Sequence, residues 1–114
     1  MILIVEDNKT WQEIYARILS EYDLTFCRDD IEAIKIIDQN PPQLIVLDIL
    51  LNGPTAFGLL NELQSYPHLA KIPIIIVSDV KLAQSRLEEY NIVKVFDKAT
   101  LNPLDLRKEI QDYV

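Results

Sequence analysis

The stretch Pro42-Gln43-Leu44-Ile45-Val46-Leu47-Asp48 decides how the rest of this chain is interpreted. Residues 44–47 are apolar without a polar residue between them, and two prolines come before them. A short, continuous apolar run of this kind is typical of a strand that is buried on both faces of a sheet. Asp48 stands where this strand leaves the sheet. An aspartate there can simply end a strand or start a turn, so its meaning depends on the other strand ends.

Four further segments have the apolar, β-branched character of short strands, namely 2–5, 24–27, 73–78 and 92–96. The segments between and after the strands carry apolar residues three and four positions apart, which predicts amphipathic helices. We expect five helices, which begin at Asn8 or Lys9, at Asp29 or Asp30, at Thr55, at Val80, and at Asn102 or Pro103. The last of these should turn Leu104, Leu106 and Ile110 inward.

The regular alternation of strand and helix predicts an α/β fold with a parallel sheet that is covered by helices on both faces. The five-stranded form of this doubly wound architecture has the strand order 2-1-3-4-5. In that order strands one and three are neighbours, and ligands bind beyond the carboxyl ends of the strands at this point. The length of 114 residues fits one domain spanning 1–114.

The composition excludes several classes of protein. The net charge of −7 argues against a nucleic-acid surface. Cys27 is the only cysteine, so no disulfide can form within the chain, and a reducing cytoplasm is the expected location. No apolar run approaches the length of a membrane span and no signal peptide opens the sequence, so we expect no membrane insertion.

Polar residues stand at four of the five expected strand ends. They are Glu6 and Asp7, Asp48, Ser78 and Lys98. Because the carboxyl ends of parallel strands meet at one edge, these side chains should share one cleft. Three neighbouring carboxylates repel one another unless a cation joins them, and Mg²⁺ prefers oxygen ligands of this kind. A lysine and a hydroxyl beside them would bind the oxygens of a phosphoryl group.

In this order at successive strand ends, these five residues resemble those of the bacterial response-regulator receiver (CheY-like) domain. The resemblance extends over essentially the whole chain. Residues 46–51, with Gly53 and Phe57 after them, also resemble the acceptor loop of that family. No one of these features is diagnostic, but together they are specific.

The resemblance implies a phosphoacceptor regulatory domain of two-component signalling rather than an enzyme. Asp48 would accept a phosphoryl group from a phosphohistidine on a histidine kinase or phosphotransfer protein, and the aspartyl phosphate would act on a downstream protein partner. Mg²⁺ would be held by Glu6, Asp7, Asp48 and the backbone carbonyl of Leu50. Ser78 and Lys98 would grip the phosphoryl group and move with it.

The sequence departs from the family pattern after the lysine and after the hydroxyl. The family usually has a cis proline after its lysine, where Ala99 stands here. A cis bond before a residue other than proline costs about 2.5–4 kcal/mol, so we expect a trans bond and a reshaped loop, with Lys98 either in the site or displaced from it. Asp79 replaces a small residue, and we expect it to point away as a helix cap.

Two further departures concern the switch and the third helix. The family's switch aromatic lies three residues before the lysine, where this chain has Val95, with Phe96 on the opposite face of the strand. Coupling of an aromatic rotamer to Ser78 is therefore not expected. Thr55-Ala56 replaces a common Asp-Gly, which we interpret as a different cap on the same helix.

Other functions remain to be weighed against a phosphorylated receiver. The first alternative is a degenerate receiver that binds a partner without phosphorylation. A phosphate-ester hydrolase with an aspartyl nucleophile usually carries a second aspartate two residues later, where Leu50 stands here. Because apolar Leu50 and Val80 would also hinder water, we expect a long-lived phosphorylated state. A flavodoxin-like electron carrier is rejected, since residues 6–9 lack a phosphate-cradling loop.

Overall fold

The computed structural model describes residues 1–50, 56–81 and 87–114. Its elements are β1 (Ile2–Val5), α1 (Lys9–Ile18), β2 (Leu24–Cys27), α2 (Asp30–Gln39), β3 (Leu44–Leu47), α3 (Phe57–Gln64), β4 (Ile74–Ser78), β5 (Ile92–Asp97), the 3-10 turn η1 (Lys98–Thr100) and α5 (Pro103–Gln111). None of the helices in these ranges has the length and apolar character needed to cross a membrane.

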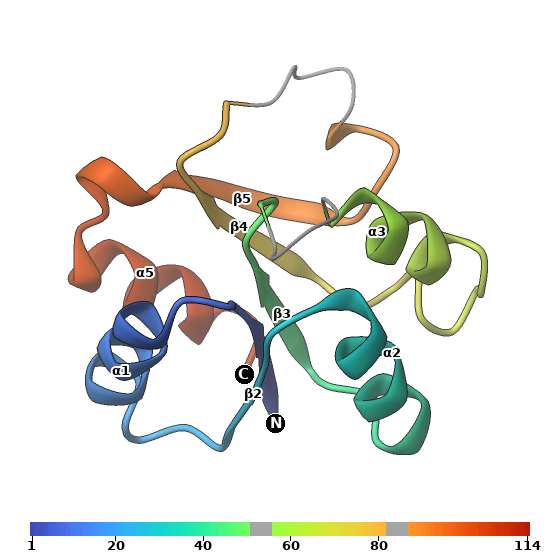
Figure 1. The fold of residues 1–114 in the computed structure, drawn as a ribbon, viewed down its shortest axis with the longest axis horizontal. Coiled ribbons are helices and arrows are strands. Elements are labelled where there is room, and N and C mark those ends of the chain that lie inside the picture. Colours follow the sequence, from blue (N-terminus) through green and yellow to red (C-terminus); the bar gives the residue numbers. More distant parts are fainter. Residues whose placement is uncertain (51–55, 82–86) are drawn as a thin grey trace.

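The five strands form one parallel sheet in the order β2-β1-β3-β4-β5, as the sequence predicted (Figure 1). β1 pairs with β3 so that Val5 lies beside Leu47. The residues that follow these two strands, Glu6 and Asp48, therefore leave the sheet next to each other. This register places the acidic residues that follow β1 against Asp48.

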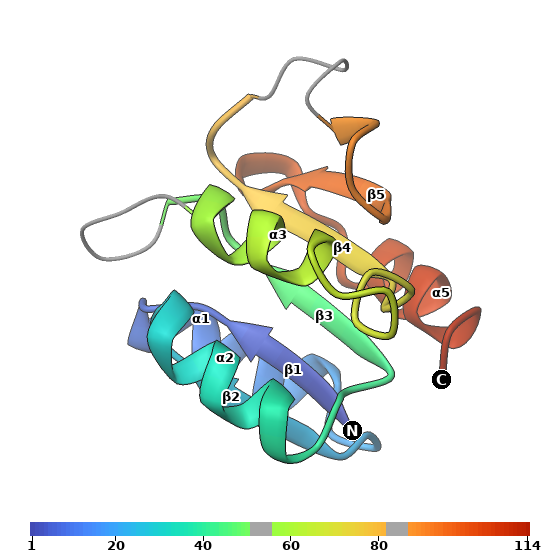
Figure 2. The same cartoon turned by 90° about the vertical axis from the view of Figure 1, so that its right-hand side faces the viewer.

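Helices cover both faces of the sheet, α1 and α5 on one face and α2 and α3 on the other (Figures 1 and 2). Alternate residues of each central strand enter different cores. In β3, Leu44 and Val46 pack with the α1 and α5 side, whereas Ile45 and Leu47 pack with the α2 and α3 side. All residues of β1, β3 and β4 are buried, which explains why these strands show no apolar–polar alternation in the sequence.

Side-chain caps fix the starts of three helices at the positions that the sequence indicated. Asn8, Asp29 and Asn102 are the N-caps of α1, α2 and α5, and each side chain accepts a hydrogen bond from a backbone N–H of the first turn. The N-cap of α3 is Ala56, without a side-chain cap bond; Thr55, the expected cap, lies outside the described residues. The expected start of a helix at Val80 is wrong, because Val80 and Lys81 are not helical. Residues 82–86 lie outside the described residues, so a helix between β4 and β5 stays a prediction.

The expected inward position of Leu104 is wrong. Leu106 and Ile110 are fully buried, four residues apart on one face of α5, whereas Leu104 is 64% exposed. The reason is helical geometry, because a residue two positions before Leu106 lies roughly 200° around the helix. The apolar stripe of α5 therefore begins at Leu106.

Cys27 is expected to resist alkylation in the folded protein. Its side chain is buried at the end of β2, and burial, with the nearby charges of Glu32 and Asp29, raises the pKa of the thiol from 9.0 to about 12. Because the thiolate is the reactive form, alkylation by iodoacetamide at neutral to mildly alkaline pH should be at least ~100-fold slower than in the urea-unfolded chain. Equal rates, followed by mass spectrometry, would contradict this. Because folding raises this pKa, ionisation of the thiol opposes folding. The contribution of Cys27 to the free energy of unfolding is therefore complete below pH 9 and is lost as the pH rises toward about 12.

Candidate functional site

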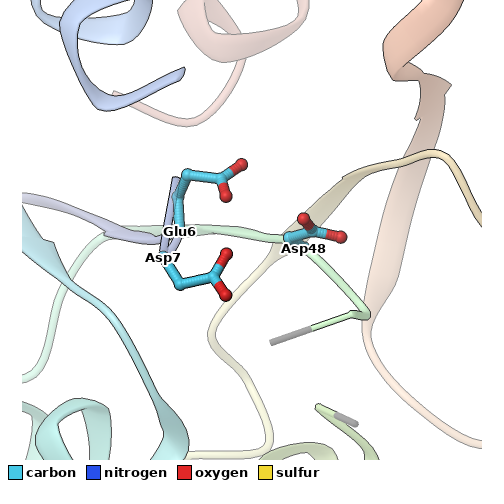
Figure 3. A group of neighbouring side chains, drawn as sticks. All are labelled: Glu6, Asp7 and Asp48. Carbon is cyan, nitrogen blue, oxygen red and sulfur yellow. The ribbon is translucent and has the colours of Figure 1, made fainter. Parts of the chain in front are cut away.

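Three carboxylates meet at the carboxyl ends of β1 and β3 (Figure 3). Glu6 and Asp7 follow β1, and Asp48 follows β3. The backbone N–H of Asp48 donates to Val5 O at 3.2 Å, which holds Asp48 beside the end of β1. Each of the three offers an oxygen, and these oxygens lie within 4.8 Å of one another. Glu6 and Asp48 are buried, with 1% and 7% exposed, while Asp7 is partly exposed. The cluster is therefore open to solvent on the side of Asp7.

Lys98 reaches into this cluster from the end of β5. Its Nζ lies 2.7 Å from Asp48 Oδ2 and 2.6 Å from Glu6 Oε1, and only 7% of its side chain is exposed. Of the two positions left open for Lys98, the structure thus shows the one in the site. Its backbone begins η1, where Asp97 accepts a hydrogen bond from Ala99 N at 2.9 Å.

The other oxygen of Asp48 is held by donors from β4 and from its own loop. Ser78 Oγ donates to Asp48 Oδ1 at 2.8 Å, and the backbone N–H of Leu50 donates to the same oxygen at 3.1 Å. Both oxygens of Asp48 are thereby oriented by hydrogen-bond donors. All five polar residues that the sequence singled out lie together at this edge of the sheet.

Burial and neighbouring charges act in opposite directions on the pKa values of Glu6 and Lys98. Burial raises the pKa of Glu6, and hydrogen bonds from Lys98 and Asn8 only partly offset this. Burial alone would lower the pKa of Lys98, but hydrogen bonds to Asp48 and Glu6 outweigh it and the pKa is raised. Lys98 is therefore charged at neutral pH. Counted formally, three carboxylates and one ammonium give the cluster a charge of −2.

The residues present fit a divalent cation. Glu6 Oε1 is buried, and apart from Lys98 Nζ, 2.6 Å away, no donor of the described residues reaches it. Asp7 accepts no hydrogen bond within the described ranges. Carboxylate oxygens are the ligands that Mg²⁺ prefers, and a charge of +2 would balance the formal charge of the site. The acidic cluster is thus consistent with a magnesium site.

The N-cap of α1 and two residues of the helix, which the sequence did not indicate as part of the site, support it. Asn8 N donates to Glu6 Oε2 at 3.1 Å, and Gln12 Nε2 donates to the backbone oxygen of Glu6 at 2.7 Å. The ring of Trp11 lies 5.0 Å from Lys98 Nζ. A signal was available, because Glu6 and Asp7 run directly into the first turn of a helix, whose residues must lie near the same strand end.

The positions that depart from the family pattern lie at the rim of the site. Asp79 is exposed beside buried Ser78, as expected, but Val80 and Lys81 are not helical, so Asp79 does not cap a helix that begins at Val80. Val95 is 40% exposed, while Phe96 packs against the core on the α1 and α5 side. These two residues therefore face opposite ways, and no aromatic ring occupies the position of Val95.

Comparison with known proteins points to one family. The family described as "Response regulator receiver domain" matches residues 2–111. The response regulator Rcp1 of Synechocystis is 25% identical over 97% of this chain and 84% of its own length. The signal receiver domain of a histidine kinase from Syntrophus aciditrophicus is 27% identical and superposes with a TM-score of 0.84, covering 98% of this chain and 87% of that one.

One similar structure carries a metal ion. The receiver domain of the sensor histidine kinase PA1611 from Pseudomonas aeruginosa has magnesium coordinated in its active-site cleft. It is 22% identical, with a TM-score of 0.83 over 98% of this chain and 94% of that chain. At this identity the likeness shows the shared fold.

Proposed function

Because this chain belongs to the response regulator receiver domain family, we propose that Asp48 is its phosphoacceptor. Domains of this family are phosphoacceptor regulatory domains of two-component signalling and interact with histidine kinases. The observation that carries the proposal is the setting of Asp48, with Oδ1 held by Ser78 and Leu50 N and Oδ2 held by Lys98. A carboxylate that merely ended a strand would need none of these three donors.

The proposed reaction transfers a phosphoryl group from a phosphohistidine of a histidine kinase or phosphotransfer protein. A carboxylate oxygen of Asp48 attacks the phosphorus, the phosphorus–nitrogen bond breaks, and the imidazole leaves with its electron pair and takes a proton from solvent. Lys98 neutralises charge on the transferred oxygens, and Ser78 donates a hydrogen bond to one of them. Once bound by Glu6, Asp7, Asp48 and the carbonyl of Leu50, Mg²⁺ would supply further charge neutralisation.

The output we propose is a contact with a downstream protein in the cytoplasm. The net charge of −7 disfavours direct binding to nucleic acid. The chain would act as one domain over 1–114, since both cores draw on elements from all parts of the sequence. A contact between two copies of this chain, in a homodimer, is a further form of output.

Intact-mass spectrometry tests the acceptor directly. The purified chain, incubated with Mg²⁺ and acetyl phosphate, should gain one phosphoryl mass of about 80 Da. The Asp48→Asn variant should gain none, while Asp38→Asn, at an exposed position late in α2, should react like the parent. A gain of equal size in Asp48→Asn would contradict the assignment, because it would place the phosphoryl group elsewhere.

A second candidate function is a receiver that binds its partner without phosphorylation. The observation in its favour is Val95, which is exposed where the family usually has its switch aromatic. If the folded parent gains no phosphoryl mass, this candidate takes precedence. A pull-down with the unphosphorylated chain would then identify the partner.

Asp7→Asn is expected to stabilise the metal-free protein by about 1 kcal/mol, because it removes one of three mutually repelling carboxylates. Little is lost in exchange, since Asp7 accepts no hydrogen bond from the described residues. The parent should also gain about 1–2 kcal/mol from saturating Mg²⁺, and the variant should lose most of that gain. Urea unfolding with and without MgCl₂ measures both effects.

Asp38→Asn is the matched control, because it removes the same charge far from the cluster. It should change neither the metal-free stability nor the response to Mg²⁺. A destabilised Asp7→Asn, or one that keeps the full Mg²⁺ response, would show that Asp7 is not part of a cation site.

A further inference from the structure

Lys98 Nζ has a third neighbour besides its two carboxylates. An ammonium group carries three N–H donors, and Asp48 Oδ2 and Glu6 Oε1 lie 2.7 Å and 2.6 Å from it. The centroid of the Trp11 ring lies 5.0 Å from the same nitrogen. This distance is within the range of a cation–π contact, and tryptophan is the best aromatic partner for one. The ammonium is therefore enclosed by two anions and one indole face.

The backbone near Lys98 offers little that would hold the side chain in place. Lys98 begins the short turn η1, in which Ala99 and Thr100 are both exposed. A lysine also has four rotatable bonds and loses much rotamer freedom when it is fixed. The position of Nζ must thus be determined by the groups that surround its far end.

Trp11 is well suited to that role because its own position is fixed. It lies in the first turn of α1, where its backbone N–H donates to the cap residue Asn8 at 3.0 Å. The centroid of its ring lies 5.8 Å from that of Tyr15, with the two planes tilted by 45°, and Tyr15 is buried in the core between the sheet and α1 and α5. The indole therefore forms a fixed side of the site.

We infer that Trp11 is a positioning residue that holds the Lys98 ammonium beside Asp48 for phosphoryl transfer. The inference rests on the proposed function, in which Lys98 must meet the oxygens of the incoming group. Glu6 and Asp48 compete for the same ammonium, and neither restrains it on the side of α1. The indole face closes that side, so that Nζ stays within reach of Asp48 Oδ2 when the charges around it change.

The rate of phosphorylation by acetyl phosphate at saturating Mg²⁺ tests this role. Trp11→Leu should react about tenfold more slowly than the parent, since it removes the ring that holds the ammonium. Trp11→Phe keeps an aromatic face and should recover most of the rate. Tyr22→Leu is the matched control: it trims an aromatic residue packed on the same core, in the segment that follows α1, and should leave the rate unchanged.

A second readout needs neither metal nor phosphodonor. In the parent, the protons on Cε of Lys98 lie near the indole face and should show upfield ring-current shifts in ¹H–¹³C spectra, assigned with Lys98→Arg. Trp11→Leu should abolish these shifts, and Tyr22→Leu should preserve them. This measurement establishes the contact in the folded protein independently of the reaction.

The outcomes separate the two claims. A parent that is phosphorylated on Asp48, with Trp11→Leu reacting at the same rate, overturns the inference and leaves the proposed function standing. Equal slowing by Trp11→Leu and Trp11→Phe also overturns it, because a general loss of packing would explain both. A parent that is not phosphorylated overturns the proposed function and the inference together, whatever the spectra show.

Discussion

Replacing Lys98 by methionine is expected to lower the free energy of unfolding by about 3 kcal/mol in the absence of Mg²⁺. Lys98 Nζ lies between Asp48 Oδ2 and Glu6 Oε1, with all three side chains at least nine-tenths buried. Methionine keeps the length and apolar stem of lysine but removes the cation. Removing one partner of a buried ion pair costs about 3–5 kcal/mol, because the remaining charge is buried without compensation. Here two carboxylates would lose their partner, and Asp7 adds to their repulsion.

The same variant should regain most of this loss when Mg²⁺ is added. A divalent cation would then be the only positive charge in the cluster, so its binding should stabilise Lys98→Met more than the parent. Phosphorylation by acetyl phosphate should nevertheless fall by at least about tenfold, since no ammonium meets the transferred oxygens. Urea unfolding with and without MgCl₂, together with intact-mass time courses, measures these three effects.

Lys94→Met is the control for this experiment. Lys94 is an exposed residue of β5 whose Nζ lies 5.7 Å from the Phe96 ring, so its replacement removes an ammonium without touching the carboxylates. It should change stability by less than about 0.5 kcal/mol and leave phosphorylation intact. A Lys98→Met variant as stable as Lys94→Met would show that the ammonium contributes no net stabilisation.

The sequence was sufficient for the strand order and for the meeting of five polar residues at one edge of the sheet, and the reason is physical. The three inner strands β1, β3 and β4 are buried on both faces, and the unbroken apolar run from Leu44 to Leu47 is typical of such a strand in a covered parallel sheet. In such a sheet every strand points toward the same edge. The polar residues that follow successive strands, from Glu6 to Lys98, were therefore bound to meet there.

The contacts between side chains could not be derived in the same way. The neighbourhood of Trp11 and Lys98 depends on the rotation of α1 about its axis and on the path of the turn after β5, neither of which a local pattern determines. For Leu104, one apolar residue near a helix start did not reveal that the stripe begins two residues later. The position of Lys98 was left open for a similar reason, since Ala99 changes the loop but not the charges that draw the ammonium inward.

The phosphorylated state is expected to last for hours once phosphodonor is removed. Hydrolysis requires a water that attacks the phosphorus while the bond to the Asp48 oxygen breaks, and a polar side chain that orients this water or takes its proton accelerates it. Leu50 stands two residues after the acceptor Asp48 and is 53% exposed. Val80 stands two residues after the hydroxyl of Ser78, and its backbone nitrogen donates to Ser78 Oγ at 3.3 Å. Neither side chain can hydrogen-bond to a water. Loss of the phosphoryl mass within seconds of desalting would refute this prediction.

Leu50→Asn should shorten that lifetime by at least about tenfold, because an amide at this position can orient the attacking water. The substitution changes only the side chain, so the N–H that donates to Asp48 Oδ1 and the carbonyl proposed as a metal ligand are both retained. Leu104→Asn, at another exposed leucine on α5, is the control for a general effect of added polarity and should keep the parent's lifetime. If Leu50→Asn and the parent lose the phosphoryl group at the same rate, then Leu50 does not limit the access of water. The stability of the acyl phosphate would in that case have to come from the donors around Asp48 itself, Ser78 and Lys98.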